Sequence, residues 1–372
     1  MKRLLSYLVL GLVLATACAG PGANRRWTAE QAREWWDGQE WPVGCCYVPG
    51  YAINQFEMWQ EETFDEAALD REMGLCEELG YNCVRIFLHE DLWFADKDGF
   101  KSRIDKFLDI AGSHGVRATI SFCTNGGTSD VHLGPQPDAE LGIHGGGHWC
   151  QTPKDDIFFN KSRWPDFKAY IQDILKTFRH DDRIVWWCLY NEPENLKDGR
   201  DCLELMTEIF KWAWEVRPDQ PLTAPIWVRP GFKGASSKLD IINFVTSNSD
   251  IISFHCYYTP DELETFIKML SRFHRPMVCQ EYMGRTLGST FQGCLPIFKR
   301  EKVAALNWGL VNNRCQFHLP WGHKPEDGEP ALWFHDIIRS DLTPYSQDEI
   351  DCIKSLTADK TLAGTEKVYP LI

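Results

Sequence analysis

The stretch RIVWWCLYNEPEN, residues 183–195, places a carboxylate directly after an apolar run. Residues 184–190 are continuously apolar or aromatic, which predicts a β-strand buried on both faces. Asn191 and Glu192 follow at once, and Pro193 ends the strand because it has no backbone N–H to donate. An unpaired buried charge is costly. Glu192 is therefore either a loop residue without function or a group that the strand holds at a functional site.

Seven further apolar runs of strand length alternate with segments of helical periodicity. The expected strands cover residues 43–48, 82–88, 117–123, 184–190, 222–227, 251–257, 277–282 and 304–311. The expected helices cover residues 65–79, 100–114, 164–179, 201–217, 238–245, 261–273, 291–301, 332–339 and 347–356. This alternation predicts an α/β fold, a single (β/α)8 TIM barrel. A doubly wound open sheet is the alternative, but no Gly-rich phosphate-binding fingerprint follows the first strand.

Polar and aromatic residues stand at the C-terminal ends of these strands, where TIM barrels carry their functional groups. The set comprises Arg85, Asn125, Asn191, Glu192, His255, Tyr257, Glu281 and Trp308. Glu192 and Glu281 follow the fourth and seventh strands, so both side chains can point into one pocket. Glycoside hydrolysis needs two such carboxyl groups around one bond. Each could instead be structural, with Glu281 paired to Arg285 and Glu192 preceding a helix, but the clustering favours a joint function.

Five short motifs carry a family resemblance. They are NEP at 191–193, QEY at 280–282, VRIF at 84–87, HCY at 255–257 and NWG at 307–309. Together they resemble the clan A retaining glycoside hydrolases, most of all glycoside hydrolase family 5, with its cellulases, mannanases and xylanases. The resemblance implies retaining hydrolysis of a β-linked glycosidic bond in a plant or host glycan, with no cofactor or metal. By resemblance, Glu192 is the acid/base and Glu281 the nucleophile.

Further roles follow from this resemblance. Asn191 is expected to bond the sugar 2-hydroxyl, His255 to lie near Glu192, and Trp308 to form the floor under the reacting sugar. Arg85 and Tyr257 are expected to keep Glu281 ionised, whereas Glu192 is expected to have a raised pKa. Family members often carry a His at the end of the third strand, where this chain has Asn125. Either Asn125 takes its place and binds sugar, or the chain belongs to a sibling family of the clan. Trp321, after the eighth strand, is either a sugar platform or a packing residue.

The long segment after the third strand suggests a rival function. It contains His132, His144, His148 and Cys150, which can be read as part of a zinc site of a metal-dependent hydrolase. Its glycines and its position favour a wall of the substrate cleft instead. A second rival is a noncatalytic glycan-binding lipoprotein, although binding alone does not require both carboxylates.

The N-terminal sequence MKRLLSYLVLGLVLATACAG, residues 1–20, has the pattern of a secretory signal. It contains a lipobox-like ATAC, which predicts a lipoprotein signal peptide over residues 1–18 and lipidation at Cys18. A short tether at 19–26 and the barrel at 27–372 would follow. We therefore expect an exported bacterial lipoprotein, anchored to the outer membrane or cell surface. A soluble secreted protein cut near Ala17 or Ala19 is the alternative.

Charge and cysteine content narrow the partners. The net charge of −14 disfavours nucleic acid as a partner, leaving an oligo- or polysaccharide. Of the 14 cysteines, 13 remain without Cys18, an odd number. Most lie in apolar runs and are expected to be free and buried, with the state of Cys45, Cys46 and Cys150 left open. The sugar, its linkage and internal versus terminal cutting are not determined by the sequence.

Overall fold

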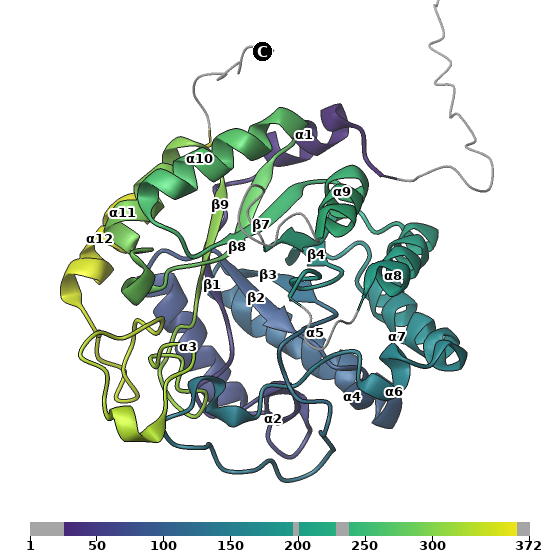
Figure 1. Ribbon diagram of the computed structural model, residues 1–372, viewed down its shortest axis with the longest axis horizontal. Helices are drawn as coiled ribbons and strands as arrows, with labels where there is room; N and C mark the ends of the chain where they lie inside the picture. Colours follow the sequence, from purple (N-terminus) through teal and green to yellow (C-terminus); the bar gives the residue numbers. More distant parts are fainter. Residues whose placement is uncertain (1–25, 196–200, 228–237, 363–372) are drawn as a thin grey trace, which may run out of the picture.

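The computed structural model describes residues 26–195, 201–227 and 238–362, and one parallel sheet forms their core. The strands are β1 (Val43–Cys46), β2 (Cys83–Phe87), β3 (Arg117–Ser121), β4 (Ile184–Cys188), β5 (Leu222–Thr223), β6 (Pro225–Ile226), β7 (Ile252–Cys256), β8 (Met277–Tyr282) and β9 (Ala304–Trp308). Their order is β5-β4-β3-β2-β1-β9-β8-β7-β6 (Figure 1). Only Ala224 separates β5, which pairs with β4, from β6, which pairs with β7. The pair is the expected fifth strand in two pieces, and it closes the predicted barrel.

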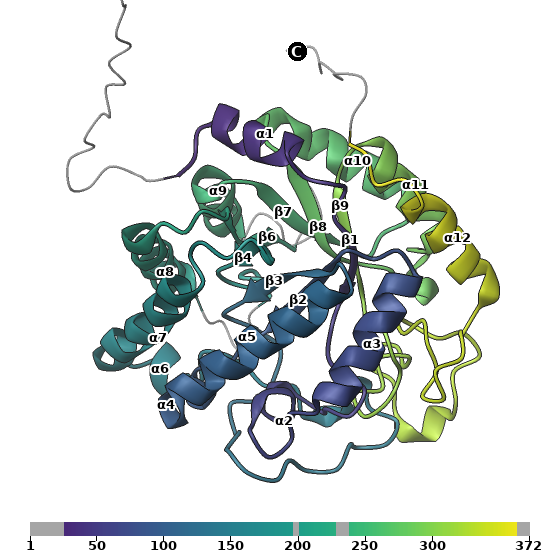
Figure 2. The same ribbon diagram turned by 180° about the vertical axis from the view of Figure 1, so that it is seen from behind.

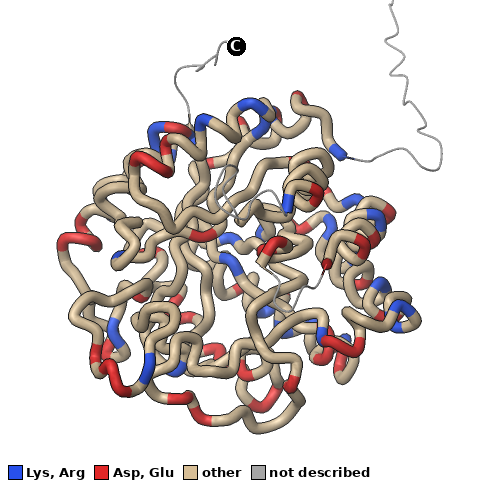
Figure 3. Tube along the Cα trace, viewed as in Figure 1, with Lys and Arg blue, Asp and Glu red and all other residues tan. Residues whose placement is uncertain are grey.

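Helices surround the strands. The long ones are α3 (Glu66–Glu78), α5 (Lys97–Ser113), α7 (Trp164–Thr177), α8 (Leu203–Val216), α9 (Leu239–Asn248), α10 (Pro260–Leu270), α11 (Phe291–Arg300) and α12 (Gln347–Thr357). Side-chain oxygens of Asp65 and Thr290 cap α3 and α11 by accepting backbone N–H groups. Seen from behind, α3 and α5 lie against the β1–β3 side of the barrel (Figure 2). Lys and Arg are interspersed with Asp and Glu around the outer helices (Figure 3).

Some local expectations differ from the structure. The short helices α1 (Ala29–Asp37), α2 (Gln55–Trp59), α4 (Glu90–Ala95) and α6 (Asp155–Phe158) were not predicted. Single 3-10 turns occur at His144–Gly147, Lys161–Arg163, Ser271–Phe273, Arg285–Leu287 and Pro325–Asp327. The prediction of a helix at 332–339 is wrong. This segment is an irregular loop in which Ile338 makes an isolated bridge to Val311.

The two ends of the barrel differ. Helix α1 covers the N-terminal end, where Ala32 and Trp36 belong to one buried cluster with residues at the starts of the strands, including Val185 and Ala304. The C-terminal end carries two long loops: residues 122–163 after β3 (the β3 loop) and residues 309–346 after β9 (the β9 loop). This end holds the carboxylates.

The cysteines of the described chain are all free. Cys45, Cys46 and Cys150 are buried, as are nine others, and Cys352 is half-buried. Among the described residues, no helix has both the length and the apolar character needed to span a bilayer. The predicted signal segment and Cys18 lie outside the described residues.

Candidate active site

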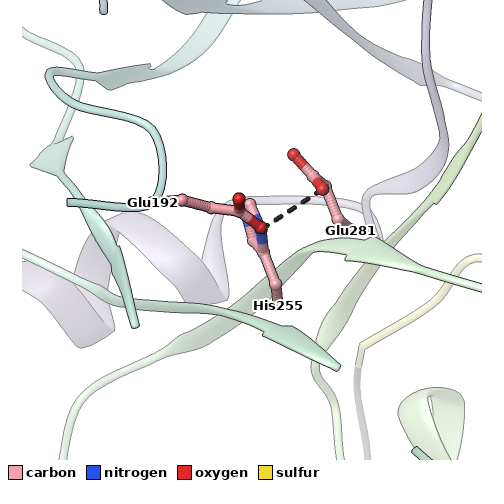
Figure 4. Close-up of side chains that lie close together, drawn as sticks. All are labelled: Glu192, His255 and Glu281. Carbon is pink, nitrogen blue, oxygen red and sulfur yellow. Dashed lines mark hydrogen bonds and ion pairs between the residues drawn. The ribbon is translucent and has the colours of Figure 1, made fainter. Parts of the chain in front are cut away.

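The two carboxylates predicted from the sequence meet at the mouth of the barrel. Glu192 follows β4, Glu281 lies in β8, and both reach His255 in β7 (Figure 4). One oxygen of each carboxylate and one imidazole nitrogen all lie within 4.8 Å of one another. Glu192 is 8% exposed and Glu281 is 5% exposed. The barrel therefore brings together two nearly buried carboxyl groups that are 89 positions apart in the chain.

Arg85, in β2, lies beneath this pair and is completely buried. Its Nη1 donates to Glu281 Oε1 at 2.6 Å, and its Nη2 donates to Asn191 Oδ1 at 2.5 Å. A buried guanidinium needs such partners because an unpaired buried charge costs several kcal/mol, on the order of 3–5. Arg85 thus fixes Glu281 and Asn191 relative to each other. The Asn191 amide oxygen is thereby engaged by the protein.

Two side chains from the end of β7 complete the hydrogen bonding. The Tyr257 hydroxyl donates to Glu281 Oε2 at 2.9 Å. His255 Nδ1 lies 2.8 Å from Glu192 Oε1 and 3.3 Å from Glu281 Oε2. Burial lowers the pKa of His255 to about 3, so the imidazole is neutral at physiological pH. A neutral ring nitrogen therefore sits between the two carboxyl groups.

The two carboxyl groups have different surroundings. Burial raises the pKa of Glu192 to about 7, and a hydrogen bond from Asn195 together with the charge of Arg85 opposes the rise. Burial also raises the pKa of Glu281, and the charge of Glu192 adds to the rise, whereas the charge of Arg85 and the hydrogen bond from Tyr257 oppose it. Glu281 contacts the guanidinium directly, whereas the bond to Glu192 Oε2 comes from the neutral Asn195 amide. A single proton shared by the pair is therefore favoured on Glu192.

Glu192 also has an unusual backbone. Its φ is +45°, in the left-handed region that non-glycine residues seldom adopt. Its carbonyl accepts hydrogen bonds from Asn125 Nδ2 and from the Asn195 N–H, both at 2.8 Å. Residues held in such conformations concentrate at functional sites. The surrounding amides thus hold the carboxyl group of Glu192 in one direction.

Asn125 was expected to bind sugar. Its Nδ2 is used by the Glu192 carbonyl, and its Oδ1 accepts from the Tyr190 hydroxyl at 3.3 Å. Both ends of this amide are therefore engaged by the protein, and the residue is only 9% exposed. In this geometry Asn125 supports Glu192 from behind.

Aromatic rings border the site on one side. Trp308, at the end of β9, packs against Phe87, Trp149 and Phe317, with ring centroids 5.6, 5.9 and 5.2 Å away. Trp321 lies 4.9 Å from Tyr257 and remains 50% exposed. Trp321 therefore both packs and offers a free face. The sequence analysis did not single out Phe317, although the aromatic content of the β9 loop was a usable signal.

The histidine-rich segment does not assemble a metal site in the described part of the chain. His144 Nδ1 lies 2.7 Å from the Leu319 carbonyl oxygen, and desolvation by the surrounding protein lowers the pKa of this half-buried His to about 4. His148 Nε2 lies 3.9 Å from Glu140 Oε1. The three potential ligands that do converge among the described residues are Glu192, His255 and Glu281. Arg85, 2.6 Å from Glu281, already places a positive charge there, which disfavours a cation.

Comparisons with known proteins support the fold. No protein-family model matches the sequence. No curated protein matches it either. Among solved structures, a GH5_18 protein from Streptomyces cattleya in complex with Manβ1-4GlcNAc has a TM-score of 0.58 at 12% identity, over 85% of this chain and 79% of that one.

Two further structures are similar. The endo-β-1,4-mannanase from Thermotoga petrophila has a TM-score of 0.54 at 14% identity, over 87% of this chain and 77% of that one. The exo-β-1,4-mannosidase Op5Man5 from Opitutaceae bacterium strain TAV5 has a TM-score of 0.56 at 18% identity, over 87% and 60%. The predicted TIM barrel, and the resemblance to family 5 at the level of the fold, are thus confirmed.

Proposed function

We propose that this protein hydrolyses a β-linked glycosidic bond with retention of configuration. The spacing of Glu192 and Glu281 carries the proposal, because one oxygen of each lies within 4.8 Å of the other. Retaining glycosidases hold their carboxyl groups about 5–5.5 Å apart, whereas inverting ones need about 6.5–9.5 Å to admit a water. The two carboxyl groups here are too close together to leave room for the nucleophilic water that an inverting mechanism places beside the sugar.

The surroundings of the two carboxyl groups support the following roles for them in the two steps. Glu281 attacks the anomeric carbon while Glu192 protonates the glycosidic oxygen; the carbon–oxygen bond breaks and the sugar is held as an ester of Glu281. Glu192, now ionised, takes a proton from a water that attacks the ester and releases the sugar and Glu281. Asn191 would bond the 2-hydroxyl and Trp308 would lie under the ring. This chemistry needs no cofactor.

A panel of aryl β-glycosides and β-linked polysaccharides tests this proposal. The structural neighbours include mannanases and mannosidases, so β-mannosides come first, followed by gluco-, xylo- and galacto-configured substrates. We expect turnover of at least one aryl β-glycoside, unchanged by a chelator. Loss of activity with the chelator would favour the metal-dependent alternative. Binding of glycans without turnover of any substrate would favour the noncatalytic one.

We also propose that the chain is an exported lipoprotein held to a membrane through Cys18, on the strength of residues 1–20. Such anchoring would place the barrel at the outer membrane or cell surface, next to extracellular glycans. The expected result is a membrane-bound protein whose mature N-terminus is a diacylated Cys18, seen by mass spectrometry. Cys18→Ser should release the protein from the membrane fraction. A mature chain that begins at another residue, without lipid, would contradict this proposal.

A further inference from the structure

The β3 loop and the β9 loop are joined to each other above the barrel, although their contacting residues are more than 170 positions apart. Six hydrogen bonds connect them: Gly142 N to Gln316 Oε1 (3.0 Å), Gln316 Nε2 to the carbonyls of Glu140 (2.8 Å) and Ile143 (3.5 Å), His144 Nδ1 with the Leu319 carbonyl (2.7 Å), His323 Nδ1 with the Gly142 carbonyl (2.8 Å) and Arg314 Nη2 to the Pro137 carbonyl (2.9 Å). The β3 loop runs along the lower edge of Figure 1 toward the β9 loop. We call the joined segments 136–149 and 314–335 the rim wall.

Glycines bring the two backbones into direct contact. A Cβ on Gly142 would lie 2.6 Å from Pro325 Cα, and one on Gly146 would lie 2.7 Å from the Arg314 carbonyl oxygen. Both glycines have positive φ, at +81° and +62°, where a side chain is also strained. No side chain therefore fits between the loops at these two points, where their backbones are in direct contact.

The inner side of the rim wall is an arc of aromatic rings. Trp149 contacts Phe87 at the end of β2, and Phe317 contacts both Trp149 and Trp308. At the other end, Trp321 contacts Tyr257 after β7. Because β1, β9 and β8 lie between β2 and β7 in the sheet, the arc spans the ends of these strands. Its rings contact Trp308 and Tyr257 directly. A second sugar on this side would have to occupy the space that these rings fill.

The arc lies on the nucleophile's side of the site. Tyr257 bonds Glu281, and Trp308 is the proposed floor for the sugar attached to Glu281. Glu192 must stand beside the oxygen that leaves, and it comes from β4, which the arc does not cross. The leaving group therefore extends toward the β4 side. With the proposed roles of Glu192 and Glu281, the rim wall would face the non-reducing end of the substrate.

We propose that the rim wall limits the glycone side to a single sugar, so that the protein removes one residue at a time from the non-reducing end of a β-linked chain. This inference rests on the proposed function and adds the action pattern to it. An internal cut would require two or more sugars between Glu281 and the wall.

The test uses 4-nitrophenyl β-glycosides that carry one, two or three β-1,4-linked sugars, in the manno, gluco, xylo and galacto series. With one glycone subsite, nitrophenol is released directly only from the single-sugar glycoside. The longer substrates should show a lag and an initial rate at least about tenfold lower. Direct release that rises with each added sugar would overturn the inference while leaving the proposed function intact. Absence of release from every member would contradict the proposed function, and the inference with it.

A variant of the rim wall provides an independent test. Gln316→Ala with His323→Ala removes four of the six loop-to-loop hydrogen bonds. We expect direct release from the two-sugar glycoside to rise relative to the single-sugar one. Gln347→Ala is the matched control, because Gln347 is exposed and bonds Asp351 within α12. If the double variant is folded and its relative rates on the one-sugar and two-sugar glycosides are unchanged, the rim wall does not determine how many sugars the glycone side accepts.

Discussion

Glu281→Gln is expected to reduce kcat on an aryl β-glycoside by about ten-thousand-fold or more, as removal of a covalent nucleophile does in other hydrolases. An amide has nearly the shape of the carboxylate but cannot attack the anomeric carbon. The Tyr257 and Arg85 contacts that now hold the carboxylate would hold a neutral group instead. Steady-state kinetics measures the loss, and calorimetric binding of the substrate checks that the pocket is still formed.

The same substitution removes the charged partner of Arg85, so stability needs a separate control. Breaking a buried ion pair costs about 3–5 kcal/mol, which thermal unfolding would detect. Asp250→Asn breaks a comparable pair, because Asp250 is buried and its Oδ2 lies 2.8 Å from Arg217 Nη2. Asp250 comes just before β7, at the opposite end of the barrel from the carboxylate pair. It should lower the free energy of unfolding but leave turnover per folded molecule unchanged. A Glu281→Gln protein with normal turnover would rule out the proposed nucleophile.

The barrel could be predicted because each strand is marked locally. A continuous apolar run such as IVWWC can be recognised without knowledge of its neighbours. The expected helix at 332–339 shows the limit of that reasoning. Trp333, Phe334, Ile337 and Ile338 have helix-like spacing, but the Arg285 guanidinium donates to the carbonyls of residues 333, 335 and 336. A distant cation thus takes acceptors that a helix would have used.

The candidate site was predictable to a similar depth. The strand ends supplied Glu192 and Glu281 because parallel strands deliver their C-terminal residues to one end of the barrel. The positive φ of Glu192 and the engagement of both ends of the Asn125 amide have no signature in the sequence, since each depends on backbone geometry. The segment after β3 was expected to form a wall of the substrate cleft, but without a partner loop. Its junction with the β9 loop depends on pairs such as Gly142 and Gln316, which no local pattern connects.

Glu192→Ala is expected to act selectively on substrates with poor leaving groups. General acid catalysis contributes about 10²–10⁴-fold, so phenyl glycosides should lose that much in kcat/KM. The 2,4-dinitrophenolate group leaves without protonation, so a 2,4-dinitrophenyl glycoside should form the Glu281 ester at close to the normal rate. Breakdown of the ester would then limit turnover because no base activates water. Added azide, which needs no base, should restore turnover and yield a β-glycosyl azide, detectable by NMR.

The pH dependence gives the same group a second signature. Glu192 must be protonated to donate, and burial raises its pKa to about 7. The kcat/KM of the wild-type protein on a phenyl glycoside should therefore fall as the pH rises through about 7. That alkaline limb should be absent from Glu192→Ala acting on the dinitrophenyl glycoside. An unchanged alkaline limb in this variant would assign the limb to another group and remove Glu192 as the proton donor.

Asn195→Ala sharpens this assignment because it changes the environment of Glu192 without removing the carboxyl group. Asn195 Nδ2 donates to Glu192 Oε2 at 2.8 Å and favours the ionised form, so it holds the pKa of Glu192 down. Without this hydrogen bond, burial should raise the pKa of Glu192 further, and the alkaline limb should move to higher pH. A merely structural defect would lower kcat/KM at every pH and leave the midpoint in place. A shift of the limb to lower pH would contradict the proposed control of Glu192 by burial and Asn195.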